Sequence, residues 1–262
     1  MSLQSPPVVI LVRPQLGENI GAAARAMMNC GLSEMRLVAP RDGWPNSAAL
    51  PMAAGGAPII ENATVHDSIA EAAHDLTFLA ALSARRRDMP VRVSDPRAVT
   101  GALLHHGAKA GLMFGPEASG LDNEDVVRAD CLVTADLNPE YPSLNLAQAV
   151  LLMAWEWRAA ANAACDDNDA DAQGRVNAAM LSDQRHQTPS DAATILERDK
   201  FHERLEAELD SGGFFISPEM APAVKRNLRA LFGRAAPTSQ EISTLHGVIQ
   251  ALTKKRDRSK SG

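Results

Sequence analysis

The 262 residues are enough for one large domain, or for a domain of about 150 residues followed by a smaller one. The longest strongly apolar run, residues 149–155, is far shorter than the roughly 20 residues that cross a bilayer, so the sequence predicts no membrane-spanning segment. The formal net charge of −6 argues mildly against a nucleic-acid partner for the chain as a whole.

The cysteines and histidines form no metal-binding pattern. Cys30, Cys131 and Cys165 stand far apart, without a CxxC pair or a Cys/His cluster at zinc spacing. The seven histidines show no ligand spacing either. The N-terminal segment also lacks a positively charged leader, so these features together predict a protein of the reducing cytoplasm that uses no metal.

The first part of the chain alternates between short apolar runs and helical stretches. Residues 8–12, VVILV, are typical of a strand buried on both faces. Asn19 is expected to cap the next helix, which ends at Gly31. Further strands are predicted at 35–38, 75–82, 111–115 and 131–135, with helices near 67–74, 95–106 and 122–129. This alternation predicts an α/β domain with a mostly parallel sheet.

Composition divides the rest of the chain. The α/β domain is predicted to span residues 1–164, ending with a long apolar helix. Residues 165–191 are acidic, polar and without periodicity, which predicts a flexible linker. Residues 192–253 have apolar residues at helical spacing and predict a small domain of three helices, followed by a basic tail at 254–262. Residues 192–262 contain 12 basic and 9 acidic residues, so this region offers the local positive charge that phosphate binding needs.

Loops rich in glycine, proline, asparagine, serine or arginine follow four of the five predicted strands, those at 8–12, 75–82, 111–115 and 131–135. Open parallel sheets bind ligands outside the carboxyl ends of their strands, so four such loops indicate a site. Gly115 and Gly120 can adopt positive φ and let a ligand approach the backbone, although they would serve equally well to turn the chain after a strand.

Arginines near these loops have two readings each. Arg25 lies among alanines on a predicted helix. Its guanidinium group either reaches solvent or points into the cleft, where it could bind a phosphate through two N–H groups. The run of Arg85, Arg86 and Arg87 is either a solvated surface or a contact for a nucleic-acid backbone.

The entrance of the last helix carries a hydroxyl and a carboxamide. Ser143 suits an N-cap, because its hydroxyl can accept from an N–H of the first turn. Asn145 is expected one turn into the helix, where it gains nothing from capping and has a mediocre helix propensity. We therefore expect Asn145 to orient a ligand hydroxyl, a function that is compatible with capping by Ser143.

Three stretches carry a resemblance to a known family. NIGAAARAMMNCG, FGPEASGLDNED and NPEYPSLNLAQAV resemble, in order and separation, the three signature motifs of the SPOUT superfamily of RNA 2′-O-ribose methyltransferases. Within it the chain looks most like the TrmJ family, which methylates cytidine or uridine at nucleotide 32 of the tRNA anticodon loop. The match covers about residues 7–160, and the C-terminal helices resemble the extension of that family.

The resemblance implies a parallel-sheet SPOUT fold whose C-terminal part forms a deep trefoil knot, plus a small C-terminal helical extension. It implies a homodimer that binds tRNA and uses S-adenosyl-L-methionine, released as S-adenosyl-L-homocysteine, with no metal. By match, the cofactor pocket is lined by Leu82, Ser83, Ala84, Gly115, Ala135, Ser143, Leu144 and Asn145. Two alternatives stay open: methylation of ribosomal RNA or of another tRNA position, and an RNA-binding protein of this fold without turnover.

The resemblance also implies Arg25, Ser143 and Asn145 as catalytic residues. Because an arginine is effectively always protonated, we expect Arg25 to clamp the neighbouring phosphate and stabilise the developing alkoxide, not to act as a base. RNA contacts are expected from Arg25 and from the run of Arg85, Arg86 and Arg87, together with the positive C-terminal helices.

Overall fold

The computed structural model describes residues 5–84, 91–166 and 191–259. Arg85, Arg86 and Arg87, and nearly all of the predicted linker, lie outside these residues. Within the described ranges, no helix combines the length and the apolarity that crossing a membrane requires.

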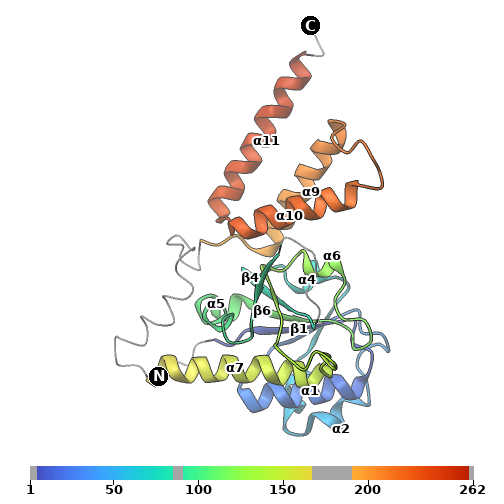
Figure 1. Ribbon diagram of the computed structural model, residues 1–262, viewed down its shortest axis with the longest axis vertical. Helices are drawn as coiled ribbons and strands as arrows, with labels where there is room; N and C mark the ends of the chain where they lie inside the picture. Colours follow the sequence, from blue (N-terminus) through green and yellow to red (C-terminus); the bar gives the residue numbers. More distant parts are fainter. Residues whose placement is uncertain (1–4, 85–90, 167–190, 260–262) are drawn as a thin grey trace.

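A parallel sheet of seven strands forms the centre of the larger domain (Figure 1). The strand order is β3-β2-β1-β6-β4-β7-β5, and every neighbouring pair is parallel. This confirms the predicted α/β class. The order does not by itself test the trefoil knot, which stays a prediction. The strands are β1 (Val8–Val12), β2 (Met35–Val38), β3 (Thr64–His66), β4 (Phe78–Leu82), β5 (Arg92–Ser94), β6 (Ala110–Phe114) and β7 (Cys131–Val133).

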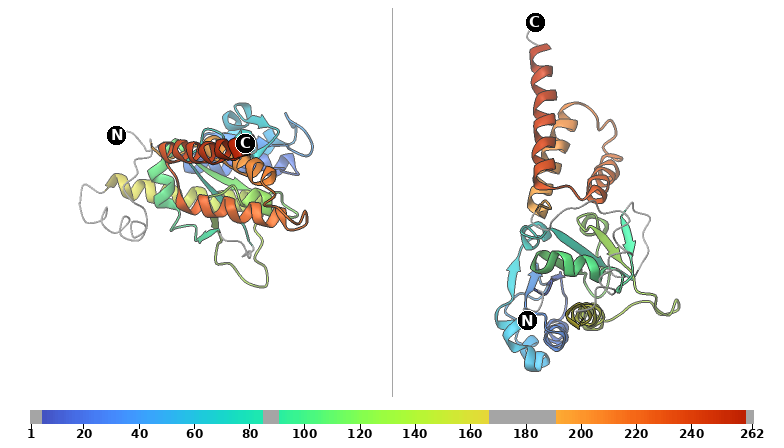
Figure 2. Two further views of the ribbon diagram at one scale, coloured as in Figure 1. Left: turned by 90° about the horizontal axis from the view of Figure 1, so that it is seen from above. Right: turned by 90° about the vertical axis from the view of Figure 1, so that its left-hand side faces the viewer.

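Helices cover both faces of the sheet. One face carries α1 (Gly17–Cys30), α5 (Thr100–His106) and α7 (Leu146–Asp166), and the other carries α4 (Ile69–Ala72) and α6 (Asn123–Val126) (Figure 1). The C-terminal extension lies beyond α4 and α6, and its last helix projects away from the sheet domain (Figure 2). The remaining elements are α2 (Ala49–Ala53), η1 (Ala54–Gly56), α3 (Ala57–Glu61), η2 (Gly107–Lys109), α9 (Ile195–Ser211), α10 (Ala221–Ala235) and α11 (Ser239–Ser259).

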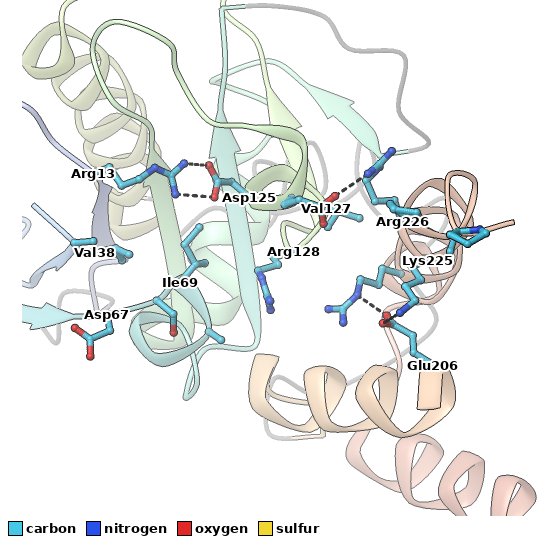
Figure 3. Close-up of a pocket in the computed structure, with 18 residues that line it drawn as sticks. Arg13, Val38, Asp67, Ile69, Asp125, Val127, Arg128, Glu206, Lys225 and Arg226 are labelled. Atoms are coloured by element: carbon cyan, nitrogen blue, oxygen red, sulfur yellow. Dashed lines mark hydrogen bonds and ion pairs between the residues drawn. The ribbon is translucent and has the colours of Figure 1, made fainter. Parts of the chain in front are cut away.

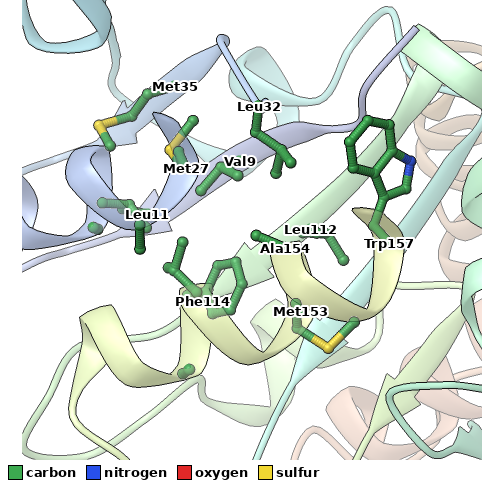
Figure 4. Packing of buried hydrophobic residues seen from close by; sticks show 14 of the residues in the cluster. Val9, Leu11, Met27, Leu32, Met35, Leu112, Phe114, Met153, Ala154 and Trp157 are labelled. Atoms are coloured by element: carbon green, nitrogen blue, oxygen red, sulfur yellow. The ribbon is translucent and has the colours of Figure 1, made fainter. Parts of the chain in front are cut away.

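Small and flexible apolar side chains build the core between the sheet and the pair α1 and α7. Met27 of α1 and Met153 and Trp157 of α7 are buried against Val9 and Leu112 of the sheet (Figure 4). All five residues of β1 are buried, as a strand covered on both faces requires. With aromatics at only 4% of the chain, alanine, leucine, valine, isoleucine and methionine fill most of the space between the layers.

Several element boundaries differ from the sequence-based predictions. The helix α1 begins at Gly17 after Leu16, so the prediction that Asn19 caps it is wrong; Asn19 lies in the first turn. The predicted end at Gly31 is confirmed, since Gly31 has φ 80° and its N–H donates to carbonyls of the last turn. At the other end of the chain, α11 runs to Ser259 and extends into the segment predicted as a basic tail.

The extension is anchored to the sheet domain by the start of α9. The backbone N–H of Ile195 donates to the carbonyl of Leu76 at 2.8 Å, and the Ile195 side chain is buried in the core on the α4 face. One turn later, the guanidinium of Arg198 contacts both carboxylate oxygens of Asp130, at 2.5 and 3.2 Å. Asp130 also accepts from the N–H of Leu79 at 2.8 Å, so one buried carboxylate joins α9 to the beginnings of β4 and β7.

Candidate active site

Three neighbouring strands, β6, β4 and β7, end at the same edge of the sheet. Leu82, the last residue of β4, is level with Phe114 of β6 and Val133 of β7. The N–H of Ser83 donates to the carbonyl of Val133 at 3.0 Å. At this edge lie five of the residues predicted to line the cofactor pocket, namely Leu82, Ser83, Ala84, Gly115 and Ala135.

The loop after β6 requires both of its glycines. A Cβ on Gly115 would lie 2.2 Å from the backbone nitrogen of Leu121, because the loop folds back over this position. Gly120 has φ 67°, a left-handed conformation that other residues rarely adopt. The chain thus packs against its own backbone at this strand end, which keeps side chains out of the edge where a ligand would bind.

A chain of side-chain hydrogen bonds joins the three motif segments. The amide nitrogen of Asn145 donates to the side-chain oxygen of Asn19 at 3.1 Å. The amide nitrogen of Asn19 donates to Glu117 at 2.7 Å, and the other carboxylate oxygen of Glu117 accepts from the N–H of Gln15 at 2.9 Å. Segments that lie up to 126 residues apart in sequence are therefore fixed to one another by polar contacts.

The entrance of α7 differs from the prediction, because Asn145 itself caps the helix. Its side-chain oxygen accepts from the N–H of Ala147 at 2.9 Å, and Gln148 reaches back to the N–H of Asn145 at 3.0 Å. Ser143 lies two residues before the cap, is exposed, and has no hydrogen-bond partner within the described residues. The expectation that Ser143 caps the helix is wrong, and so is the expectation that Asn145 gains nothing from capping.

Arg25 is not in contact with the other predicted catalytic residues. It is exposed on α1 and makes no ion pair with any other residue that the structure describes. Six residues separate Arg25 from Asn19, which is about 9 Å along the helix axis and about 120° around it. Within one chain, the Asn19–Glu117–Asn145 cluster and Arg25 therefore lie on different faces of α1.

One buried hydroxyl fits a ligand at this edge. The side-chain oxygen of Thr134 is buried and has no hydrogen-bond partner among the residues that the structure describes, while the backbone N–H of Thr134 donates to the carbonyl of Ser94 at 3.0 Å. Thr134 directly precedes Ala135, so a polar ligand group at the end of β7 would satisfy this hydroxyl. The glycines of the loop after β6 would let a ligand come close to the backbone, and the Thr134 hydroxyl could form a hydrogen bond with it. A polar cofactor could use both features.

Sequence reasoning missed three of these residues. The sequence predicts only a capping role for Asn19 and no role for Glu117 or Thr134, although Asn19 and Glu117 stand inside the motif segments. The partners of Asn19 lie 98 and 126 residues away, so no local pattern could have identified its contacts.

A cleft of about 610 Å³ lies between the sheet domain and α10 (Figure 3). Its charged side chains are mostly paired across or along the cleft. Arg226 of α10 contacts Glu124 of α6 at 2.7 Å, and Arg229 contacts Glu206 at 2.9 Å. Arg13, at the end of β1, pairs with Asp125 and borders both this cleft and the loop after β6.

Comparisons with known proteins agree with this geometry. A family model for the C-terminal domain of tRNA methyltransferase TrmJ matches residues 197–261. A tRNA (cytidine/uridine-2'-O-)-methyltransferase TrmJ of Pectobacterium atrosepticum is 35% identical over 95% of this chain and 97% of its own length. A tRNA (cytidine/uridine/adenosine-2'-O-)-methyltransferase TrmJ of Pseudomonas aeruginosa is 33% identical over 94% of this chain and 93% of its own.

Among solved structures, the crystal structure of TrmJ from Z. mobilis superimposes with a TM-score of 0.81 at 38% identity, covering 95% of this chain and all of that one. A probable methylase family protein from Haemophilus influenzae covers 97% of this chain with a TM-score of 0.57 and 29% identity. The model of the SpoU rRNA Methylase family matches residues 6–155, which hold all three motif segments. The chain therefore belongs to the SpoU methylase family and carries a TrmJ-type C-terminal domain.

Proposed function

We propose that this chain transfers a methyl group from S-adenosyl-L-methionine to the ribose 2′-oxygen of tRNA, at the cytidine or uridine of nucleotide 32 in the anticodon loop. The observation that carries the proposal is the hydrogen-bonded series Asn145, Asn19 and Glu117, which joins the three motif segments at the carboxyl edge of the sheet. The choice of tRNA as the substrate is supported by the TrmJ relatives, which match over nearly the whole chain.

The residues at the ends of β4, β6 and β7 would hold the cofactor, with Thr134 donating or accepting one hydrogen bond. S-adenosyl-L-methionine, when bound, supplies an electrophilic methyl group on a sulfonium. The chain must then align the acceptor oxygen and stabilise the charge that develops on it, which positioning and preorganised donors achieve. The Asn145 amide is preorganised because its oxygen is held by Ala147 and its nitrogen by Asn19.

Arg25 is assigned to the phosphate beside the target ribose and to the developing alkoxide. Its guanidinium is exposed and has no carboxylate partner within the described residues, so it is free to take a bidentate phosphate contact. Because Arg25 faces away from Asn145 in its own chain, we assign it to the site of a second copy in a homodimer.

An apolar surface on α1 and α7 supports such a dimer. Leu151 and Trp155, one helical turn apart on α7, are 43% and 63% exposed, and Met28 on α1 is 39% exposed. Two packed helices that both leave large apolar side chains in water are suited to pair with the same helices of a second copy.

RNA binding is assigned to the extension and to the run Arg85, Arg86 and Arg87. The affinity for tRNA is then expected to fall steeply with salt, because each neutralised phosphate releases counterions. We accordingly assign the protein to the cytoplasm, where it would meet tRNA. Methylation of ribosomal RNA or of another tRNA position is the alternative, and a binding protein without turnover is a further one.

The decisive experiment incubates the purified full-length chain with unmodified tRNA and S-adenosyl-L-methionine, and locates 2′-O-methyl groups by mass spectrometry of nuclease fragments. We expect methylation at nucleotide 32, its loss in Glu117→Gln, and no loss in Glu61→Gln, which alters an exposed residue at the end of α3, outside the three motif segments. Methylation of a ribosomal fragment only, or bound cofactor without any transfer, would select one of the alternatives.

The role of Arg25 has its own test, in which single-turnover rates are measured at saturating tRNA. Arg25→Ala is expected to slow methyl transfer itself by about 100-fold or more, as loss of one charge-stabilising donor does. Arg97→Ala is the control, because the Arg97 side chain is 89% exposed and lies 3.8 Å from its nearest carboxylate. A weaker tRNA affinity with an intact rate would remove the alkoxide role.

A further inference from the structure

The loop between α9 and α10, residues 212–220, presents apolar side chains to water. Phe214 is 54% exposed, Met220 is 61% exposed and Ile216 is 93% exposed. A single exposed apolar residue on a surface is ordinary, but three within seven positions, one of them almost fully solvated, indicate a binding surface.

Hydrogen bonds hold this loop in shape, so the exposure is not the result of a frayed helix end. Gly213 has φ 73° and its N–H donates to the carbonyl of Asp210 at 2.9 Å. The N–H of Phe214 donates to the carbonyl of Leu209 at 2.9 Å, and that of Met220 to Ser217 at 3.1 Å. The turn therefore directs Phe214 outward from a fixed backbone.

Aromatic rings and a positive charge lie side by side in this loop. The rings of Phe214 and Phe215 pack edge to face, with centroids 5.4 Å apart. The ammonium group of Lys225, on the next helix, lies 5.2 Å from the centroid of the Phe215 ring. The exposed ring of Phe214 and the half-buried ring of Phe215 are therefore bordered by one cation, Lys225, which also lies 3.6 Å from a carboxylate oxygen of Glu206.

This combination favours one class of partner. Unpaired nucleotides of RNA stack their bases on aromatic side chains and place their phosphates on lysine and arginine. The region 192–262 has 12 basic and 9 acidic residues. This excess of positive charge favours a polyanion such as RNA over an apolar protein surface as the partner. The loop also adjoins the interdomain cleft, since Pro218, Ala221 and Lys225 line it together with Arg13, which borders the loop after β6.

We infer that Phe214, Phe215 and Ile216 form a stacking surface for an unpaired base of the tRNA substrate, with Lys225 binding the adjoining phosphate. The inference rests on the proposed function, because it adds a contact for the same substrate. It assigns to the extension a preference for single-stranded nucleotides, in addition to its positive charge.

The test compares tRNA affinities of the full-length chain over a series of salt concentrations. Phe214→Ala is expected to weaken binding of tRNA about 5- to 100-fold, the range found for loss of one stacked base, and Phe214→Trp to restore it. The slope of affinity against salt stays unchanged in Phe214→Ala, whereas Lys225→Ala reduces it by about one phosphate. Val65→Ala, at a side chain 47% exposed on the edge strand β3, is the matched control.

Two RNA probes and one hydrodynamic measurement separate the possible outcomes. The wild-type chain should prefer an anticodon stem-loop to a fully paired duplex, and Phe214→Ala should reduce that preference. An unchanged affinity in a Phe214→Ala/Ile216→Ser double variant overturns the inference, as does a changed oligomeric state in sedimentation, which would mark a protein contact. If the wild-type chain methylates tRNA while these variants bind it normally, only the stacking surface fails and the proposed function stands.

Discussion

Asn145 combines two functions that usually fall to different residues. Its side-chain oxygen caps α7, the longest helix of the sheet domain, and its side-chain nitrogen joins that helix to α1 by donating to Asn19. An N-cap is a rigid position, because the cap, the first helical turn and Gln148 constrain it together. A side chain placed there brings a fixed amide to the site without needing a further supporting contact.

This dual function leads to a prediction for Asn145→Ser. Serine is as good a cap as asparagine, so we expect the free energy of unfolding to change by less than about 0.5 kcal/mol. The amide donor is lost, so single-turnover methyl transfer should fall by at least about tenfold. Asn145→Ala, which also removes the cap, should lower stability by about 1 kcal/mol. Equal rates for Asn145→Ser and the wild type would leave Asn145 as a capping residue only.

The same residue shows what local patterns can predict. The spacing of Asn145 and Gln148 is a capping signal that the sequence already contains. A cap at Ser143 instead predicts a helix start two residues before the observed start at Leu146. The contact from Asn19 to Glu117 could not be predicted in this way, because the two residues meet only once the sheet is assembled. Motif segments could thus be located, but not the bonds between them.

At the scale of elements, the strength of the apolar pattern decided which strands were predictable. All residues of β1, β2 and β6 are buried, and all three strands were expected. The edge strands β3 and β5 have three residues each, with two exposed and one half-buried, so their sequences show no apolar run. Both were missed because an edge strand is identified by its backbone pairing with a neighbour, which side-chain composition does not report.

The ion pair of Arg198 and Asp130 determines how firmly the extension is held. Arg198→Met leaves the Asp130 carboxylate, which is 11% exposed, without its charged partner. We expect the free energy of unfolding to fall by about 3–5 kcal/mol, as it does when one member of a buried pair is removed. Arg97→Met, at a side chain that is 89% exposed, should cost less than about 0.5 kcal/mol in urea unfolding. Similar losses for the two variants would mean that the extension is not anchored by this pair.

The anchoring also affects how a shortened chain should be interpreted. Removing residues 165–262 takes Ile195 out of the core of the α4 face and leaves Asp130 unpaired. A loss of tRNA binding in such a fragment would therefore mix lost contacts with lost stability. Charge changes on the surface of α10 in the full-length chain test RNA binding without this complication.

The packing of α9 against α10 makes the extension sensitive to acid. Burial and, to a smaller extent, the nearby guanidinium groups of Arg229, Arg198 and Arg128 together lower the pKa of His202 to about 3. The unfolded chain binds this proton near pH 6.5 while the folded chain does not, so stability is full above that pH and is lost as the pH falls. We expect His202 to account for about 2 kcal/mol of lost stability between pH 7 and pH 5.

His202→Phe keeps an aromatic ring beside Phe201 and Phe232 and removes the titrating group. Its unfolding free energy should therefore depend less on pH than that of the wild type between pH 7 and pH 5, with urea titrations at each pH as the measurement. Parallel pH profiles for the two proteins would show that His202 takes up no proton on unfolding in this range.

At the scale of the whole molecule, the proposed joint action of Arg25 and Asn145 would require a second copy of the chain. The two residues lie on different faces of the α1 and α7 pair, and the apolar side chains Leu151 and Trp155 mark the surface where that copy would bind. If Arg25 of one chain serves the Asn145 site of the other, each active site contains residues from both chains.

Mixed dimers test this arrangement directly. Arg25→Ala alone is expected to keep about 1% of wild-type activity or less, and Asn145→Ser alone about 10% or less. When the two variants are co-expressed with different tags, each heterodimer keeps one site with both native residues, so a random mixture should recover about a quarter of wild-type activity. The activity should follow the fraction isolated through both tags. It should disappear in a Trp155→Arg background, because an added charge on the apolar surface separates the chains. If Arg25 and Asn145 act within one chain, each heterodimer has two defective sites, and the doubly tagged fraction is as inactive as its parents.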